Sequence, residues 1–271
     1  MRPRQYTGVV RAVSLVLLGG VVCYSATPDD ALKRLALEAD RFAEAAPGWV
    51  ATESLRQTAP TGAREVVSEY GFMTLPSGTR EVRRVLSVDG KNVKSSKKLD
   101  SLALAMASDN DAVRRKLLEA FEKHGLHGVA TDFGQLIMLF AHGNMQKFEF
   151  SGAQHVTLTK QAYLLFRFQQ LDGTESLTIY EGDKPVKQKL RGQLWARDED
   201  GLPVRIALDS EHEEKGVQVR DIGTVDYQPS SGGFLLPTVV VHKQFRDARL
   251  YVEDTFRYSD YREVEPSASK K

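Results

Sequence analysis

The side chains that could do chemistry in this sequence are few and scattered. His124 and His127 have a three-residue spacing that could share a metal ion. Gly125 between them breaks a helix, so a favourable contact with a helix dipole is the alternative. Ser95 and Lys98 fit the Ser-x-x-Lys pattern of acylating enzymes, but that class's other motifs are missing and a solvated loop also explains them.

Two further sets of acidic and basic residues have simple structural explanations. His212 precedes two glutamates, but no second histidine follows at zincin spacing. Asp198 and Asp200 could form an acid–base pair, although turn preference explains both. We therefore expect no catalytic residue, no metal ion and no cofactor, and a hydrolase with an unrecognised site is the least favoured hypothesis.

The charge balance excludes a general attraction to nucleic acid. The chain of 271 residues has 37 Lys and Arg against 36 Asp and Glu, a net charge of +1. Arg83, Arg84 and Lys91 form only a mild basic patch, without aromatic residues for stacking. With 41% hydrophobic residues the composition is globular, and no repeat indicates a solenoid or propeller.

The N-terminus predicts export. Three arginines within the first 11 residues precede an apolar run over residues 12–23, which is too short to cross a bilayer comfortably. Cleavage after Ser25 places the small residues Cys23 and Ser25 at −3 and −1, whereas cleavage after Ala26 would place Tyr24 at −3. We predict a signal peptide over residues 1–25 and a location in the periplasm or cell envelope.

Cys23 is the only cysteine. It could be a lipid-attachment site, although Val22 precedes it where lipoprotein signals have a small residue. On the alternative explanation it leaves with the signal peptide, and the mature chain has neither a disulfide nor thiol chemistry.

The sequence predicts a first helix over Pro28–Ala45. Its apolar stripe is predicted to contain Leu32, Leu35, Leu37, Ala39 and Phe42. A hairpin formed by residues 66–75 and 81–88 follows, around the turn 76–78.

A helical insert is predicted over residues 97–143. It holds three short amphipathic helices, the last one capped by Thr131 or Asp132 and ended by Gly143. Helices this short must dock on another surface, and we expect them to form a lid over the concave face of the sheet.

After Gly143, apolar and polar residues alternate in short runs separated by turn signals, which indicates an antiparallel meander. Leu164, Phe166 and Phe168 should point inward while Arg167 points to water. A meander of this length must curl. The expected fold is α+β: a strongly curved antiparallel sheet of about 10–12 strands, an incomplete barrel, in one domain over 28–262 with a flexible tail at 263–271.

The apolar residues around the insert suggest a binding cavity, although an ordinary packed core is the alternative. The candidate ligand-binding residues, as pocket lining or lid, are Leu136, Ile137, Phe140, Phe148, Phe150, Leu164, Phe166 and Phe168.

Several segments resemble the outer-membrane lipoprotein-sorting (LolA-like) family. The segments 191–197 and 202–206 are similar to that family's "G-x-[LV]-W-x-D … P-x-[RK]" hairpin, and 235–238 and 258–261 are similar to its last strands. The resemblance implies an incomplete barrel with a helical lid and an apolar pocket for acyl chains. The favoured hypothesis is a monomeric, exported binder or carrier of a lipid or other apolar ligand. The alternative is a non-enzymatic scaffold or adaptor that binds another envelope protein.

Overall fold

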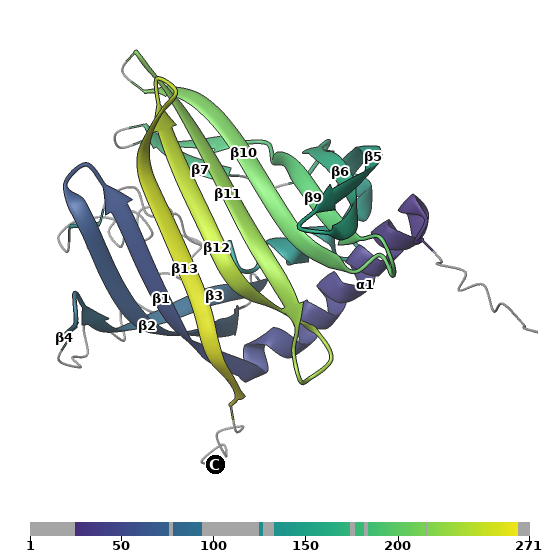
Figure 1. Cartoon of the computed structure of the whole chain (residues 1–271), viewed down its shortest axis with the longest axis horizontal. Coiled ribbons are helices and arrows are strands. Elements are labelled where there is room, and N and C mark those ends of the chain that lie inside the picture. The colour runs from purple at the N-terminus through teal and green to yellow at the C-terminus, as the bar shows by residue number, and fades with distance from the viewer. Residues whose placement is uncertain are drawn as a thin grey trace, which may run out of the picture.

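The computed structural model describes residues 25–75, 78–93, 125–126, 133–173, 177–181, 184–214 and 216–264. In these ranges one α-helix accompanies an antiparallel sheet of 11 strands, in the order β4-β3-β2-β1-β13-β12-β11-β10-β9-β6-β5, and a two-stranded sheet β7-β8 (Figure 1). Of the expected signal peptide only its last residue, Ser25, is described. The expected tail starts where β13 ends, and residues 265–271 lie outside the described ranges.

The helices and strands have bounds close to those that the periodicity predicts. They are α1 Pro28–Ala45, η1 Ala46–Gly48, β1 Trp49–Ala59, β2 Gly62–Leu75, β3 Gly78–Val88, β4 Lys91–Asn92, η2 Leu136–Phe140, η3 Met145–Lys147, β5 Phe148–Leu158, β6 Gln161–Gln170, β7 Leu177–Glu181, β8 Lys184–Gln188, β9 Arg191–Arg197, β10 Pro203–Glu214, β11 Val217–Pro229, β12 Leu235–Arg246 and β13 Arg249–Glu263. The predicted hairpin is confirmed as β2 and β3, which pair from Leu75↔Gly78 to Val66↔Val88.

Helix α1 begins and ends where the sequence predicts. The Thr27 side chain accepts a hydrogen bond from the Asp30 backbone N–H at 3.2 Å, and Pro28 occupies the first turn, where its missing N–H costs nothing. Its buried residues include Leu35 and Phe42. Leu37, which we expected on the apolar stripe, is exposed because it lies about 200° around the helix from Leu35.

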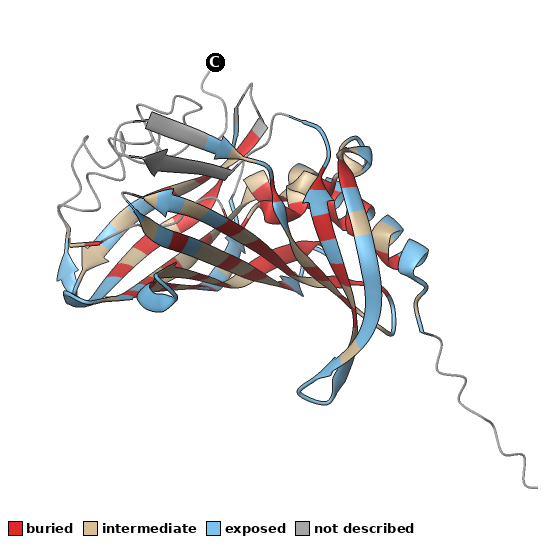
Figure 2. Ribbon diagram, turned by 90° about the horizontal axis from the view of Figure 1, so that it is seen from above, coloured by how far each residue is buried: buried red, intermediate tan, exposed pale blue. Residues whose placement is uncertain are grey.

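The alternation predicted for the meander is confirmed in β6. Leu164, Phe166 and Phe168 are buried while Arg167 and Gln169 are exposed. We call the face that carries the buried residues the inner face and the opposite one the outer face. Figure 2 shows the buried residues gathered where the inner face meets α1, so the main core lies between this helix and the sheet.

The sheet is not closed into a barrel. Its two edge strands are β4 and β5, and β5 pairs only with β6. The long strands β10 to β13 form the central arch, and β5, β6 and β9 curl away from it (Figure 1). The expectation of an open, strongly curved sheet of 10–12 strands is therefore confirmed.

The helical lid expected over residues 97–143 is not found in the described part of that segment. Its first two helices fall on residues 94–124, outside the described ranges. The third is not an α-helix but the 3₁₀ helix η2, with Phe133, Leu136, Ile137 and Phe140 buried in the core.

The side chain of Tyr227 explains this difference. Its hydroxyl donates to the Gly134 carbonyl oxygen and accepts from the Ile137 N–H, each at 3.0 Å. Because both backbone groups bond to Tyr227, they are not available for the hydrogen bonds between residues i and i+4 that define an α-helix. Met138 N–H instead bonds to the Gln135 carbonyl oxygen, three residues earlier, at 2.9 Å.

Candidate functional site

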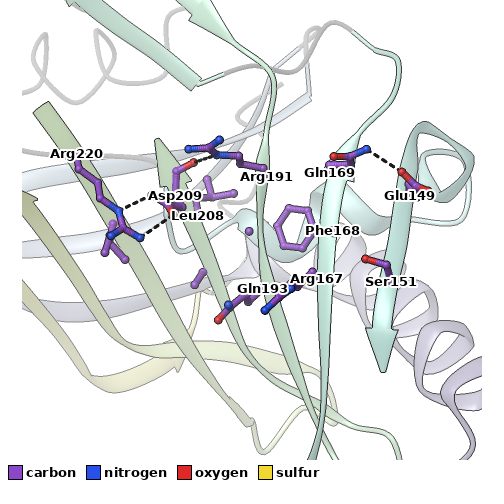
Figure 3. Close-up of a pocket in the computed structure, with 13 residues that line it drawn as sticks. Glu149, Ser151, Arg167, Phe168, Gln169, Arg191, Gln193, Leu208, Asp209 and Arg220 are labelled. Atoms are coloured by element: carbon purple, nitrogen blue, oxygen red, sulfur yellow. Dashed lines mark hydrogen bonds and ion pairs between the residues drawn. The ribbon is translucent and has the colours of Figure 1, made fainter. Parts of the chain in front are cut away.

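An open groove lies where strand β9 separates from strand β10. Pairing between them ends at Gly192↔Leu208, whereas β10 continues along β11 to the pair Glu214↔Val217. Beyond Gly192 the strands diverge, and a cavity of about 620 Å³ opens beside them (Figure 3). This is a size typical of ligand pockets, which occupy roughly 300–1,000 Å³.

The floor of the groove is apolar and depends on a glycine. Phe168, Gly192 and Leu208 lie directly opposite one another on β6, β9 and β10. A Cβ atom on Gly192 would lie 1.8 Å from the Ala207 carbonyl oxygen and 2.9 Å from the Phe168 ring. Only glycine therefore allows the ring to pack over the β9 backbone. Ala207 and Ile222 add further apolar surface.

The rim of the groove is polar and carries three arginines. The Arg220 guanidinium forms a bidentate pair with Asp209, at 3.1 and 2.9 Å, and this hydrogen bonding raises the pKa of Arg220. Arg191 Nη2 lies 3.5 Å from a carboxylate oxygen of Glu211 on the far side of the gap. The third arginine is Arg167 of β6, which is exposed on the outer face of the sheet and lines the groove.

Amide and hydroxyl groups complete the rim. The Gln169 amide donates to the Glu149 carboxylate at 2.7 Å. Ser151 and Gln193 lie on either side of Arg167, on the neighbouring strands β5 and β9. The groove therefore combines apolar residues with donors and ion pairs around its opening.

The eight residues that the sequence proposed for ligand binding are brought close together. Phe140, Phe148 and Phe168 form one cluster, with the Phe140 ring centroid 5.0 Å from each of the other two, and the half-exposed Phe150 lies 5.6 Å from Phe140. The remaining members, all buried in the core, are Leu136, Ile137, Leu164 and Phe166. Phe168 lines the groove, and the other seven are not among its lining residues.

The other candidates from the sequence have structural roles or are not described. His124, His127, Ser95 and Lys98 lie outside the described residues. Asp200 pairs with Arg197 and accepts from the Leu202 N–H, as turn preference implies. Asp198 accepts from the hydroxyl of Ser25 at 2.7 Å and lies 2.8 Å from His155 Nδ1.

The basic patch expected from Arg83 and Arg84 does not exist as a surface. Arg84 is exposed on the outer face, but Arg83 points into the interior. Its Nε donates to both carboxylate oxygens of Glu53, at 2.9 and 2.7 Å, and its Nη2 lies 2.8 Å from Glu81. Burial alone would lower the pKa of Arg83, and the two carboxylates reverse this and raise it.

Sequence reasoning missed a second buried polar group, around His242. Its Nδ1 lies 3.1 Å from Asp254 and its Nε2 lies 2.9 Å from Asp221. The alternation contains the signal, because His242 and Glu53 have the same inward phase as the buried Val240 and Leu55.

The described residues provide no metal centre and no membrane-spanning helix. No group of three or more His, Cys, Asp or Glu side chains in the ranges given above could hold a metal ion. Within the same ranges, no helix combines the length and the hydropathy needed to cross a bilayer.

Three solved structures resemble this fold. An outer membrane lipoprotein-sorting protein domain from Vibrio parahaemolyticus is 12% identical, with a TM-score of 0.45 over 89% of this chain and 95% of that chain. A LolA superfamily protein from Nitrosomonas europaea is 12% identical, with a TM-score of 0.37 over 88% of this chain and 96% of that chain. A DUF1329 family protein from Desulfovibrio piger is 9% identical, with a TM-score of 0.41 over 91% of this chain and 96% of that chain.

At such identities and TM-scores, the likeness carries no information on ligand or activity. No protein-family model and no curated protein matches the chain.

Proposed function

We propose that this protein is an exported, non-enzymatic binding protein of the cell envelope, and that it takes a lipid or another apolar ligand in the groove between β9 and β10. The observation that carries the proposal is the composition of that groove. The half-exposed Ile222 lies above the buried side chains of Phe168 and Leu208 and is surrounded by polar residues, in a cavity of about 620 Å³.

The floor connects the groove with the aromatic cluster proposed from the sequence. Phe168 belongs to both, since its ring centroid lies 5.0 Å from that of Phe140 and 6.3 Å from that of the half-exposed Phe150. Displacing water from the half-exposed Ile222 in the groove would favour an apolar chain by about 25 cal/mol for each Å² that it covers. A short acyl chain lying across Gly192 would contact both sides of the gap.

Binding of a neutral fluorescent probe, N-phenyl-1-naphthylamine, tests the proposal. Ile222→Asp adds a charge to the half-exposed apolar part of the floor and should weaken probe binding about tenfold. Val241→Asp is the matched control, because Val241 is a half-buried β-branched residue on the outer face of β12, away from the groove. A wild-type protein that binds no probe, or equal losses in the two variants, would refute the assignment.

The alternative is an adaptor that binds another envelope protein. The edge of β5 favours it, because among the described strands β5 pairs only with β6, and the residues from Ser151 to His155 are exposed. An open strand edge can accept a further strand. Absence of probe binding, together with a stoichiometric protein complex that Ala153→Lys abolishes, would support this alternative.

A further inference from the structure

We propose that Ser151, Arg167 and Gln193 form a head-group site in the groove, which binds a phosphate group carried by an amphiphilic ligand. This inference rests on the proposed function, because it assigns the polar end of the same ligand. We call these three residues the donor row.

Sheet register places the three side chains next to one another. Ser151 of β5 lies directly opposite Arg167 of β6, which lies directly opposite Gln193 of β9. Side chains directly opposite on one face of an antiparallel sheet have Cβ atoms roughly 4.5–5.5 Å apart. Figure 3 shows the row across the three strands, with Arg167 and Gln193 close together. A hydroxyl, a guanidinium and an amide can thus converge on one group.

The donor row is free to bind, unlike the other polar residues of the groove. Arg220 is held by Asp209, Arg191 approaches Glu211, and Gln169 is bonded to Glu149. The side chains of the donor row form no hydrogen bond or ion pair with the part of the chain that the structure describes. Their donors are therefore available to a ligand.

The chemistry of the row favours an anion. Arginine keeps its charge at all ordinary pH values, and its planar donors match the oxygens of a phosphate group. The row contains no carboxylate, and Ala207, the next residue across β10, has no polar side-chain atom. Arg191 and Arg220 lie beside Glu211 and Asp209, so Arg167 is the arginine of the groove that no carboxylate of the described residues neutralises.

The apolar floor argues that the phosphate is attached to a chain. Phe168 is buried on the inner face, but the half-exposed Ile222 lies on the same outer face as the donor row and lines the same groove. A free phosphate ion would use the donors and leave Ile222 in water. A ligand with a phosphate head and an apolar tail uses both surfaces.

Three ligands distinguish these sources: dodecyl phosphate, dodecyl maltoside and inorganic phosphate, with both alkyl compounds kept below their critical micelle concentrations. Calorimetry on the wild-type protein should show dodecyl phosphate binding at least tenfold more tightly than dodecyl maltoside. Higher salt should reduce this preference, because the site is exposed to solvent. In Arg167→Gln the ratio of the two affinities should fall to near one.

Arg84→Gln is the matched control. Arg84 is an exposed arginine on the outer face of β3, paired with Glu69 and outside the groove, so its replacement should leave the preference intact. Since Arg167 is also exposed, both variants should keep the thermal transition of the wild type.

The outcomes separate the two proposals. An unchanged preference in Arg167→Gln would overturn the head-group site while leaving apolar binding in the groove standing. Binding of inorganic phosphate without either alkyl compound would refute the amphiphile and indicate a site for the free ion. Absence of binding for all three ligands would contradict the proposed function and this inference together.

Discussion

Arg83 Nε donates to both carboxylate oxygens of Glu53 inside the sheet's inner face, where neither side chain is more than 5% exposed. Desolvation of two charges is costly, and their attraction offsets the cost only while both partners remain. Glu81 adds a second carboxylate, which is held by Arg83 and by the Tyr70 hydroxyl at 3.0 Å. The stability of the fold therefore depends on keeping both partners of this buried ion pair.

Replacing Arg83 by methionine should destabilise the protein by about 3–5 kcal/mol, because it removes the cation that is hydrogen-bonded to the buried Glu53 carboxylate. Urea denaturation measures this as a lower midpoint with an unchanged slope. Arg84→Met on the same strand removes an exposed ion pair and should cost about 1 kcal/mol or less. Equal costs for the two variants would mean that the buried pair contributes no more than a surface pair.

Stability should fall as the pH rises from about 6.5 to about 9, because of His242. Burial alone would lower the pKa of this imidazole, but the hydrogen bonds that it donates to Asp221 and Asp254 outweigh this effect and raise the pKa to about 9. The folded state therefore binds a proton more tightly than the unfolded state. The resulting stability is fully present below pH 6.5 and is lost through pH 9, a total of about 3 kcal/mol.

Denaturation midpoints at pH 6, 7.5 and 9 test this dependence. Asp221→Asn removes one of the two carboxylates and should flatten the curve over the same interval. A wild-type midpoint that stays constant from pH 6 to 9 would show that folding does not raise the pKa of His242.

Tyr227→Phe should cost about 1–3 kcal/mol, because it leaves the Gly134 carbonyl oxygen and the Ile137 N–H without their shared partner. Hydrogen exchange at the Ile137 amide should become faster than in the wild type. Tyr251→Phe on the exposed side of β13 is the control and should change neither quantity. Unchanged exchange at Ile137 would indicate that the hydroxyl does not hold this turn.

Phe166→Ala should cost about 3–5 kcal/mol, since the ring is only 2% exposed in a packed core. The midpoint of chemical denaturation measures the loss. A cost well below this range would mean that the ring borders a cavity, as in the pocket that we considered from the sequence.

The helix and the faces of the strands were predictable because they depend on local periodicity. The stripe containing Leu35 and Phe42 repeats at helical spacing, and Leu164, Phe166 and Phe168 repeat every second residue. In each case a shift in phase would expose apolar side chains or bury Arg167. The prediction for this helix was wrong at Leu37, which we placed on the apolar stripe and which is exposed.

The groove was not predictable, because it depends on where two strands stop pairing. Nothing local in Gly192 indicates that β9 leaves β10 there, and Arg167 was interpreted only as a solvent-facing residue. The 3₁₀ helix was missed for a similar reason. Tyr227, which bonds to Gly134 and Ile137, lies about 90 residues further along the chain.

We propose, as the sequence predicts, that export removes residues 1–25 and leaves Ala26 as the first residue. The Ala26 nitrogen already donates to the Asp198 carbonyl oxygen at 2.7 Å, and the carboxylate of the same residue accepts from the hydroxyl of Ser25, the residue before Ala26. Cleavage would turn that nitrogen into an ammonium group next to a carboxylate that is largely buried. The mature protein should therefore lose about 1 kcal/mol in Asp198→Asn, and acetylation of its N-terminus should cause a similar loss. Intact mass and N-terminal sequencing of protein from the envelope fraction establish the cleavage site, and a full-length chain retained in the cytoplasm would refute the export prediction.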